Sequence, residues 1–89
     1  MSNVFIALQA NEDSRPIVDA ILADNPGAVL NEQPAMVKID VPGRMTIRRS
    51  SVEARIGREF DLQEMQVNLI SLSGHVDETD EEFTLSCER

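Results

Sequence analysis

The chain has 89 residues, enough for one domain, and 42% of them are hydrophobic but only 3% aromatic. Sixteen acidic and eight basic residues give a formal net charge of −8. Nucleic-acid binders need basic surfaces that displace counterions from phosphate, and anionic membranes repel acidic surfaces, so neither is an expected partner.

A first strand and a first helix are predicted near the N-terminus. Residues 4–8 form a continuous apolar run typical of a strand that is buried on both faces. A helix follows, because Asp13 or Ser14 can accept hydrogen bonds from its first N–H groups and Pro16 suits its first turn. The polar run 24–27 ends this helix. Its apolar stripe consists of Ile17, Val18, Ile21 and Leu22.

The middle of the chain predicts short strands joined by turns. The expected strands are residues 28–30, 36–40 and 45–47. The second of them alternates between apolar and polar residues, as a strand with one buried face does. Pro42 and Gly43 occupy positions suited to a type II turn. We therefore expect residues 45–47 to return antiparallel to residues 36–40.

A second helix is predicted to begin at Ser50. Glu53 follows Ser50 at the spacing of a reciprocal capping box, in which each side chain bonds the other residue's backbone N–H. Val52 and Ile56 face inward, and Gly57 supplies the left-handed residue that ends the helix.

The last third of the chain predicts two strands separated by an acidic loop. Residues 66–72 form the longest strand candidate, with Val67 and Leu69 on one face. Ile70 points to the other face if the strand alternates regularly or bulges. The remaining expected segments are a turn at 73–75, an acidic loop at 77–82 and a strand at 83–86.

Together these segments predict an α+β fold with the order β-α-β-β-β-α-β-β. A mostly antiparallel sheet covered by two helices accommodates this order. Each half of the chain contains a strand, a helix and two strands, which indicates a degenerate repeat. We expect a single domain over residues 1–89 with two sub-lobes, about 1–43 and 44–89.

The charges are unevenly placed along the chain. Six of the eight basic residues lie between Lys38 and Arg58, and residues 77–82 are nearly all acidic. One interpretation is a solvated surface with balanced charges. The other is a polarised surface that orients the protein on a charged partner and speeds their encounter.

The residues offer little for catalysis or metal binding. A structural zinc site needs about four nitrogen or sulfur ligands, and the chain has one histidine, His75, and one cysteine, Cys87. The acidic run lacks the ligand spacing and central glycine of a calcium loop. No phosphate-binding glycine motif or nucleophile elbow occurs. We therefore expect a non-enzymatic protein, without cofactor or metal, that binds another protein.

The chain is also expected to be cytoplasmic. A single cysteine cannot form an internal disulfide, which gives no indication of an oxidising compartment. The N-terminal residues lack the basic region of a signal peptide, and no apolar run approaches the ~20 residues of a membrane span.

Four segments carry a resemblance to a known family: residues 4–9, 34–40, 56–61 and 82–85. In this order and spacing they resemble the effector proteins, also called coupling or regulatory proteins, of bacterial multicomponent diiron monooxygenases. The phenol hydroxylase regulatory component is the most similar in length, acidity and these segments. The resemblance extends from residue 3 to residue 86.

The resemblance implies a cofactor-free protein that binds the diiron hydroxylase, a large oligomer. Docking would reshape the hydroxylase active site and its access path. It would couple NADH oxidation, delivered indirectly by an iron–sulfur flavin reductase, to hydroxylation of an aromatic substrate such as phenol. Exchange between monomer and dimer is allowed for the free protein.

The resemblance also implies a docking face in the strand and turn at residues 68–74. The candidate partner-binding residues there are Asn68, Ile70, Ser71 and Ser73. Asn68 and Ser71 have an equally plain interpretation as the solvent face of an amphipathic strand. Pro34 and Met36 form a second candidate contact, because Met36 is a flexible apolar side chain beside a rigid bend.

Two other functions stay open at this point. A small-molecule-binding regulatory domain of the ferredoxin-like type shares the α+β pattern, and the turn at Pro42 and Gly43 gives it weak support. A minor enzyme that uses a pair of carboxylates is the third hypothesis. Neighbouring genes for a diiron hydroxylase and an iron–sulfur flavin reductase would favour the effector.

Overall fold

The computed structural model describes residues 3–87 and has an α+β fold, as predicted. Its elements are β1 (Asn3–Gln9), α1 (Arg15–Asp24), β2 (Val29–Glu32), β3 (Met36–Pro42), β4 (Arg44–Arg48), α2 (Arg49–Ile56), the 3-10 helix η1 (Leu62–Val67), β5 (Leu69–Ser73), β6 (His75–Glu78) and β7 (Glu82–Ser86). The predicted order of strands and helices is confirmed, with η1 and β6 added to it. No helix within residues 3–87 is long and apolar enough to cross a membrane.

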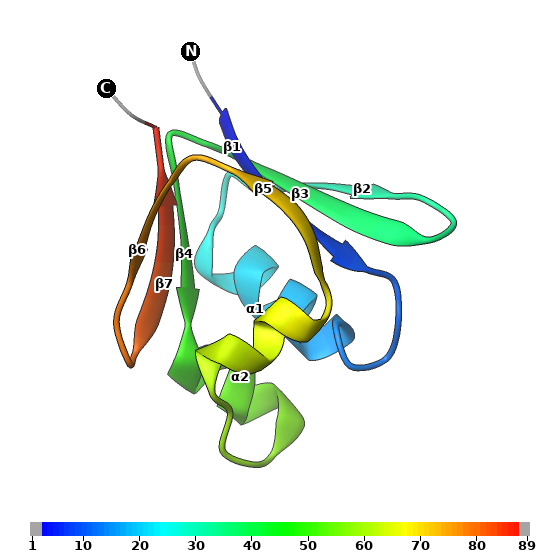
Figure 1. The fold of residues 1–89 in the computed structure, drawn as a ribbon, viewed down its shortest axis with the longest axis vertical. Helices are drawn as coiled ribbons and strands as arrows, with labels where there is room; N and C mark the ends of the chain where they lie inside the picture. The colour runs from blue at the N-terminus through cyan, green and yellow to red at the C-terminus, as the bar shows by residue number, and fades with distance from the viewer. Residues whose placement is uncertain (1–2, 88–89) are drawn as a thin grey trace.

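The strands form two antiparallel sheets that meet at an angle (Figure 1). The first sheet has the order β2-β3-β1-β5, and the second has the order β4-β7-β6. The prediction that residues 45–47 pair with residues 36–40 is therefore wrong, because β4 pairs with β7. Gly43 has a φ of 77°, and after this residue the chain leaves the first sheet instead of folding back on it.

The core lies between the two sheets and α1. Figure 1 shows α1 beside the first sheet and next to β4. The residues that α1 buries are Ile17, Val18, Ala20 and Ile21. The sheets contribute aliphatic residues that are almost inaccessible to solvent: Val4, Ile6, Leu8, Ile39, Met45, Ile47 and Leu85. This aliphatic core agrees with the low aromatic content of the sequence.

A buried asparagine joins α1 to the second sheet. The Asn25 amide donates to the carbonyl oxygens of Ile21 and Thr46, both at 2.8 Å. Its Oδ1 accepts a 2.9 Å hydrogen bond from the Thr46 N–H. Asn25, which is only 7% exposed, thus ties the end of α1 to β4 with three hydrogen bonds.

The predicted start of the second helix is wrong in detail. The residue before α2 is Arg48, and no side chain caps the helix. Glu53 instead accepts hydrogen bonds from Arg49 Nε at 3.0 Å and from the Phe60 N–H at 2.8 Å. The predicted end is correct, because Gly57 has a φ of 77° and its N–H bonds the Glu53 carbonyl.

The region before β5 also differs from the prediction. Residues 62–67 form η1, so the strand predicted at residues 66–72 begins only at Leu69. Asp61 with Glu64 forms the capping box at the beginning of η1. Val67 consequently lies on the 3-10 helix and is 77% exposed, not on the buried face of a strand. The acidic run expected to be a loop forms β6 as far as Glu78, because β7 supplies its backbone partners.

A candidate docking ribbon at the sheet edges

β5 and β6 lie at the edges of different sheets and follow one another in the chain. Among residues 3–87, β5 pairs only with β1, and β6 pairs only with β7. In Figure 1 the two strands form an arch from one sheet to the other. We call residues 69–78 the docking ribbon. Along its length one backbone edge has no strand partner within residues 3–87, and such an edge is open to another molecule.

Gly74 allows the ribbon to bend between the two sheets. Its φ of 130° is a conformation that residues with side chains rarely adopt. A Cβ atom at this position would lie 2.9 Å from Val4 Cγ1 and 3.2 Å from the Ser86 carbonyl oxygen. Only glycine therefore lets the ribbon pass so close to both sheets.

A β-bulge interrupts the pairing of β5 with β1. The register shifts between Ala7 and Leu8, whose partners on β5 are Ser71 and Leu69. Ile70 is therefore an extra residue with no partner on β1. A bulge of this kind re-aims side chains, and Ile70 is 48% exposed.

The bulge also explains which β5 residues face the core. Leu69 and Leu72 are three positions apart, yet both are half-buried and pack against the core. Regular alternation would place them on opposite faces. Because the bulge inserts one residue between them, both leucines point inward and Ile70 points outward.

Asn68 is a buried residue whose hydrogen bonds fix the start of the ribbon. Its Oδ1 accepts a 2.8 Å hydrogen bond from Asn11 Nδ2, and its carbonyl oxygen accepts one of 2.8 Å from the Gln9 N–H. Its own N–H donates to the Met65 carbonyl at 3.1 Å. Only 9% of Asn68 is exposed. This residue thus fixes the strand that carries Ile70 and offers little surface itself.

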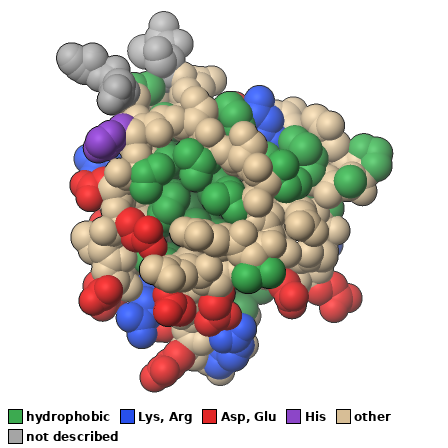
Figure 2. Space-filling view, in the orientation of Figure 1, with side chains coloured by type: hydrophobic (Ala, Val, Ile, Leu, Met, Phe, Trp, Pro, Cys, Tyr) green, Lys and Arg blue, Asp and Glu red, His purple; other side chains and the backbone are tan. Residues whose placement is uncertain are grey.

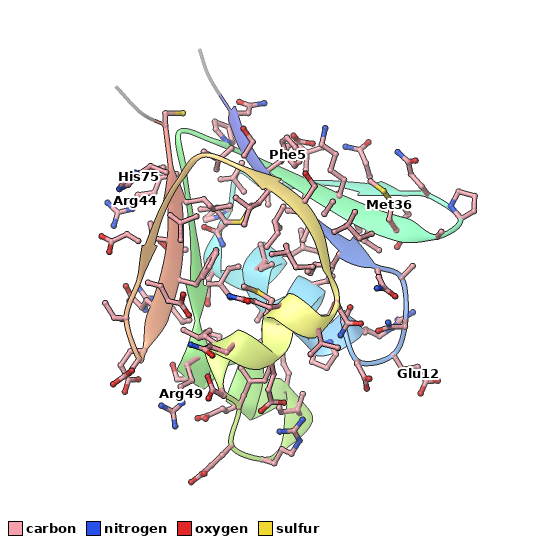
Figure 3. All side chains as sticks on the ribbon, in the orientation of Figure 1. Phe5, Glu12, Met36, Arg44, Arg49 and His75 are labelled. Atoms are coloured by element: carbon pink, nitrogen blue, oxygen red, sulfur yellow. The ribbon has the colours of Figure 1, made fainter. Side chains whose placement is uncertain are left out.

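The other predicted contact residues fall into two places. Ser71 and Ser73 are exposed on β5 beside Ile70. Pro34 is exposed in the turn before β3, and Met36 is half-buried at the start of that strand (Figure 3). Since β1 separates β3 from β5, this turn lies two strand spacings from the ribbon, roughly 10 Å.

Exposed aliphatic side chains accompany the ribbon. Val67 precedes it and Val76, 41% exposed, lies on β6. Figure 2 shows hydrophobic side chains gathered in the middle of this face, with acidic side chains along its left and lower borders. Sequence patterns did not reveal these two valines as exposed. Val67 resembled a core position, and Val76 is a single apolar residue in a polar segment.

The perturbed ionisable groups lie near α2 and η1, not on the ribbon. The pKa of Glu53 is lowered, first by the hydrogen bond from the Phe60 N–H and then by the Arg49 guanidinium. The Glu53 side chain in turn raises the pKa of Arg49. Arg58, followed by the Asp61 N–H, lowers the pKa of Glu64. These contacts fix the position of the loop between α2 and η1.

The described residues offer no metal site. Among residues 3–87, no three histidine, cysteine, aspartate or glutamate side chains are grouped so that they could hold a metal ion. A groove of about 400 Å³ lies between α1 and the turn before β3, with Val18, Leu22 and Leu30 among its apolar lining residues. Its size would admit a small molecule.

The sequence matches one protein family over almost its whole length. A profile of the MmoB/DmpM family matches residues 2–86. The chain is 48% identical to the stimulatory component DmpM of phenol 2-monooxygenase from Pseudomonas sp. strain CF600, over 94% of this chain and 93% of that protein. It is 29% identical to the effector subunit of the alkene monooxygenase system of Xanthobacter autotrophicus strain Py2, over 85% and 77% of the respective chains.

Solved structures show the same fold. A chain in the structure of a phenol hydroxylase–regulatory protein complex superposes with a TM-score of 0.94 and 44% identity, covering 98% of this chain and 100% of that one. The soluble methane monooxygenase regulatory protein B has a TM-score of 0.76 at 18% identity, covering 97% of this chain and 65% of that one. The second likeness concerns the fold alone.

Proposed function

Because the chain belongs to the MmoB/DmpM family, we propose that it is a non-catalytic effector that docks on the hydroxylase of a multicomponent monooxygenase. Two relatives support this proposal by their names, one a stimulatory component and one an effector subunit. A third similar chain was solved in a complex with phenol hydroxylase.

The docking ribbon is the proposed contact surface, and the bulge at Ile70 is the observation that carries it. An aliphatic side chain aimed outward from an edge strand fits the apolar centre of an interface. Ser71 and Ser73 would form part of its polar rim. The turn with Pro34 and Met36 would extend the contact, and Asn68 would hold the ribbon in shape.

Docking would act on the hydroxylase by favouring one of its conformations. A partner shifts such an equilibrium only by as much as it binds one state more tightly than the other. We propose that the favoured state has an altered active-site geometry and access path. NADH consumption by the iron–sulfur flavin reductase would then be coupled to hydroxylation of an aromatic substrate such as phenol. The cytoplasm is the proposed location of this complex.

The test is the variant Ile70→Asp in an assay with a diiron phenol hydroxylase, its reductase and NADH. A charge placed at the centre of an interface is strongly unfavourable, so we expect stimulation of hydroxylation to fall at least tenfold. The matched control is Val29→Asp, because Val29 is 56% exposed on β2, at the opposite edge of the same sheet. The control should stimulate normally.

Circular dichroism must show that both variants are folded. Normal stimulation by folded Ile70→Asp would place the docking surface elsewhere. An equal loss with Val29→Asp would mean that the assay responds to added charge and not to this position.

A further inference from the structure

The negative charge of the protein resides in one continuous part of the chain. Residues 59–87 contain eight aspartate and glutamate residues and no lysine or arginine. Their formal charge, with histidine neutral, is therefore −8, which equals the net charge of the whole chain. The other 60 residues contain eight acidic and eight basic residues and balance to zero.

This charged third of the chain builds the surface around the docking ribbon. It comprises η1, β5, β6 and β7 together with the loops that join them. Some of its carboxylates are paired, because Arg58 bonds Glu64 at 3.2 Å and Arg48 bonds Glu82 at 3.6 Å. Cations from the loop after α2 and from β4 thus pair with only some of the carboxylates of this segment.

Four carboxylates at the end of β6 and in the following turn make no ion pair among the described residues. They are all exposed, and we call them the acidic turn: Asp77, Glu78, Asp80 and Glu81. Arg49 approaches the turn, but its N–H and Nη1 donate to the backbone oxygens of Glu81 and Asp80. Its Nε is held by Glu53. The turn therefore remains strongly negative.

The acidic turn directly follows the apolar part of the ribbon. Val76 is adjacent in sequence to Asp77, and in Figure 2 acidic side chains border the apolar area on its left and lower sides. A surface with an apolar centre and a rim of one charge is complementary to a surface with an apolar centre and a rim of the opposite charge.

We propose that the partner surface covering the docking ribbon presents lysine and arginine side chains to the acidic turn, and that their attraction speeds association. This inference rests on the proposed docking function and adds the chemistry of the partner. Charges on an edge strand also prevent edge-to-edge aggregation, and that role alone would leave the association rate unchanged. Measured association rates therefore distinguish the two roles.

The experiment measures association and dissociation rates with purified phenol hydroxylase at several ionic strengths. The test variant is Glu78→Gln/Asp80→Asn, since among residues 3–87 neither side chain takes part in a hydrogen bond or ion pair. The matched control is Asp19→Asn/Glu32→Gln, which removes the same charge from exposed positions on α1 and β2. We expect the test variant to associate about three- to tenfold more slowly at low salt, and the difference to disappear at high salt.

The dissociation rate should change little, because rim charges act mainly on encounter. Equal association rates for the wild type and the test variant would overturn the inference. So would an equal slowing of the control, because it would show that only net charge matters. Absence of any association with the wild-type protein would instead overturn the proposed function itself.

Discussion

β1 and β5 are neighbours in one sheet but differ in how far their neighbours enclose them. β1 is hydrogen-bonded to strands on both sides, and Val4, Ile6 and Leu8 are buried. β5 is bonded on one side only, carries a bulge and exposes Ile70. The central side chains of β1 are enclosed by their surroundings, whereas three of the five side chains of β5, those of Ile70, Ser71 and Ser73, are exposed. Under the proposed function, β1 contributes to stability and β5 to docking, so a variant can remove one and spare the other.

The largest expected effect on stability comes from a variant in the buried interior. Asn25→Ala would leave the N–H and carbonyl groups of Thr46 and the Ile21 carbonyl without their partner in a buried place. We expect the free energy of unfolding to fall by about 2–4 kcal/mol, measured by urea denaturation.

The control for this variant is Asn31→Ala. Asn31 is exposed on β2 and its amide makes one long hydrogen bond, 3.3 Å to Asp40. Its removal should change stability by less than about 0.5 kcal/mol. Similar losses for both asparagines would mean that Asn25 does not hold the second sheet to α1.

A second variant lies where the buried interior meets the docking ribbon. Asn68→Ala removes the hydrogen bond to Asn11 that holds the start of the docking ribbon. Stability should fall by about 1 kcal/mol, because one partly buried hydrogen bond is lost. The free energy of binding to the hydroxylase should fall by more than the free energy of unfolding does, since the bulge would be less well ordered.

Asn11→Ala removes the same bond from the other side, together with the 2.9 Å bond that Asn11 Oδ1 accepts from the Ser14 N–H, so docking and not stability is compared. The two single variants should weaken docking equally, and the double variant should be no worse than either. Unchanged docking by folded Asn68→Ala would show that the hydrogen bond between Asn68 and Asn11 contributes to stability only.

The smallest expected effect on stability concerns the two residues that match a helix-capping pattern, Asp61 before η1 and Ser50 in α2. Asp61→Ala should lower the free energy of unfolding by roughly 0.5–2 kcal/mol, because Asp61 caps η1 and bonds the Gln63 N–H at 2.9 Å. Ser50→Ala should have no measurable effect, since Ser50 is exposed and caps nothing. Urea denaturation of both variants checks this, and a larger loss at Ser50 would place a capping interaction there.

Local patterns predicted much of the fold. The strand at the N-terminus, the helix after Ser14, the turn at Gly43 and the helix end at Gly57 all follow from neighbouring residues. The division into two sheets could not be predicted, because a glycine turn serves a hairpin and a change of sheet equally well. Only the inward side chains of β4 and β7, once packed together, decide between them.

The capping box shows how a tertiary contact overrides a local pattern. The spacing of an acceptor and a glutamate three residues later occurs at Ser50–Glu53 and again at Asp61–Glu64. Only the second forms, because Glu53 is engaged by the backbone of Phe60. In the candidate site, the exposure of Ile70 follows from alternation with Leu69, whereas that of Ser71 and Ser73 depends on the bulge. The burial of Asn68 was not predictable, since it depends on Asn11 in a distant loop.

The pairing of β1 with β5 has a consequence for the order in which the fold forms. β1 is the first strand of the described residues, whereas its partner β5 and β7, the partner of β6, lie in the last third of them. Contacts between such distant segments form late, because the chain between them must first be ordered. The docking ribbon therefore reaches its bent, bulged shape only late in folding. A variant that lacks β1 or β7 would not form the surface proposed to dock.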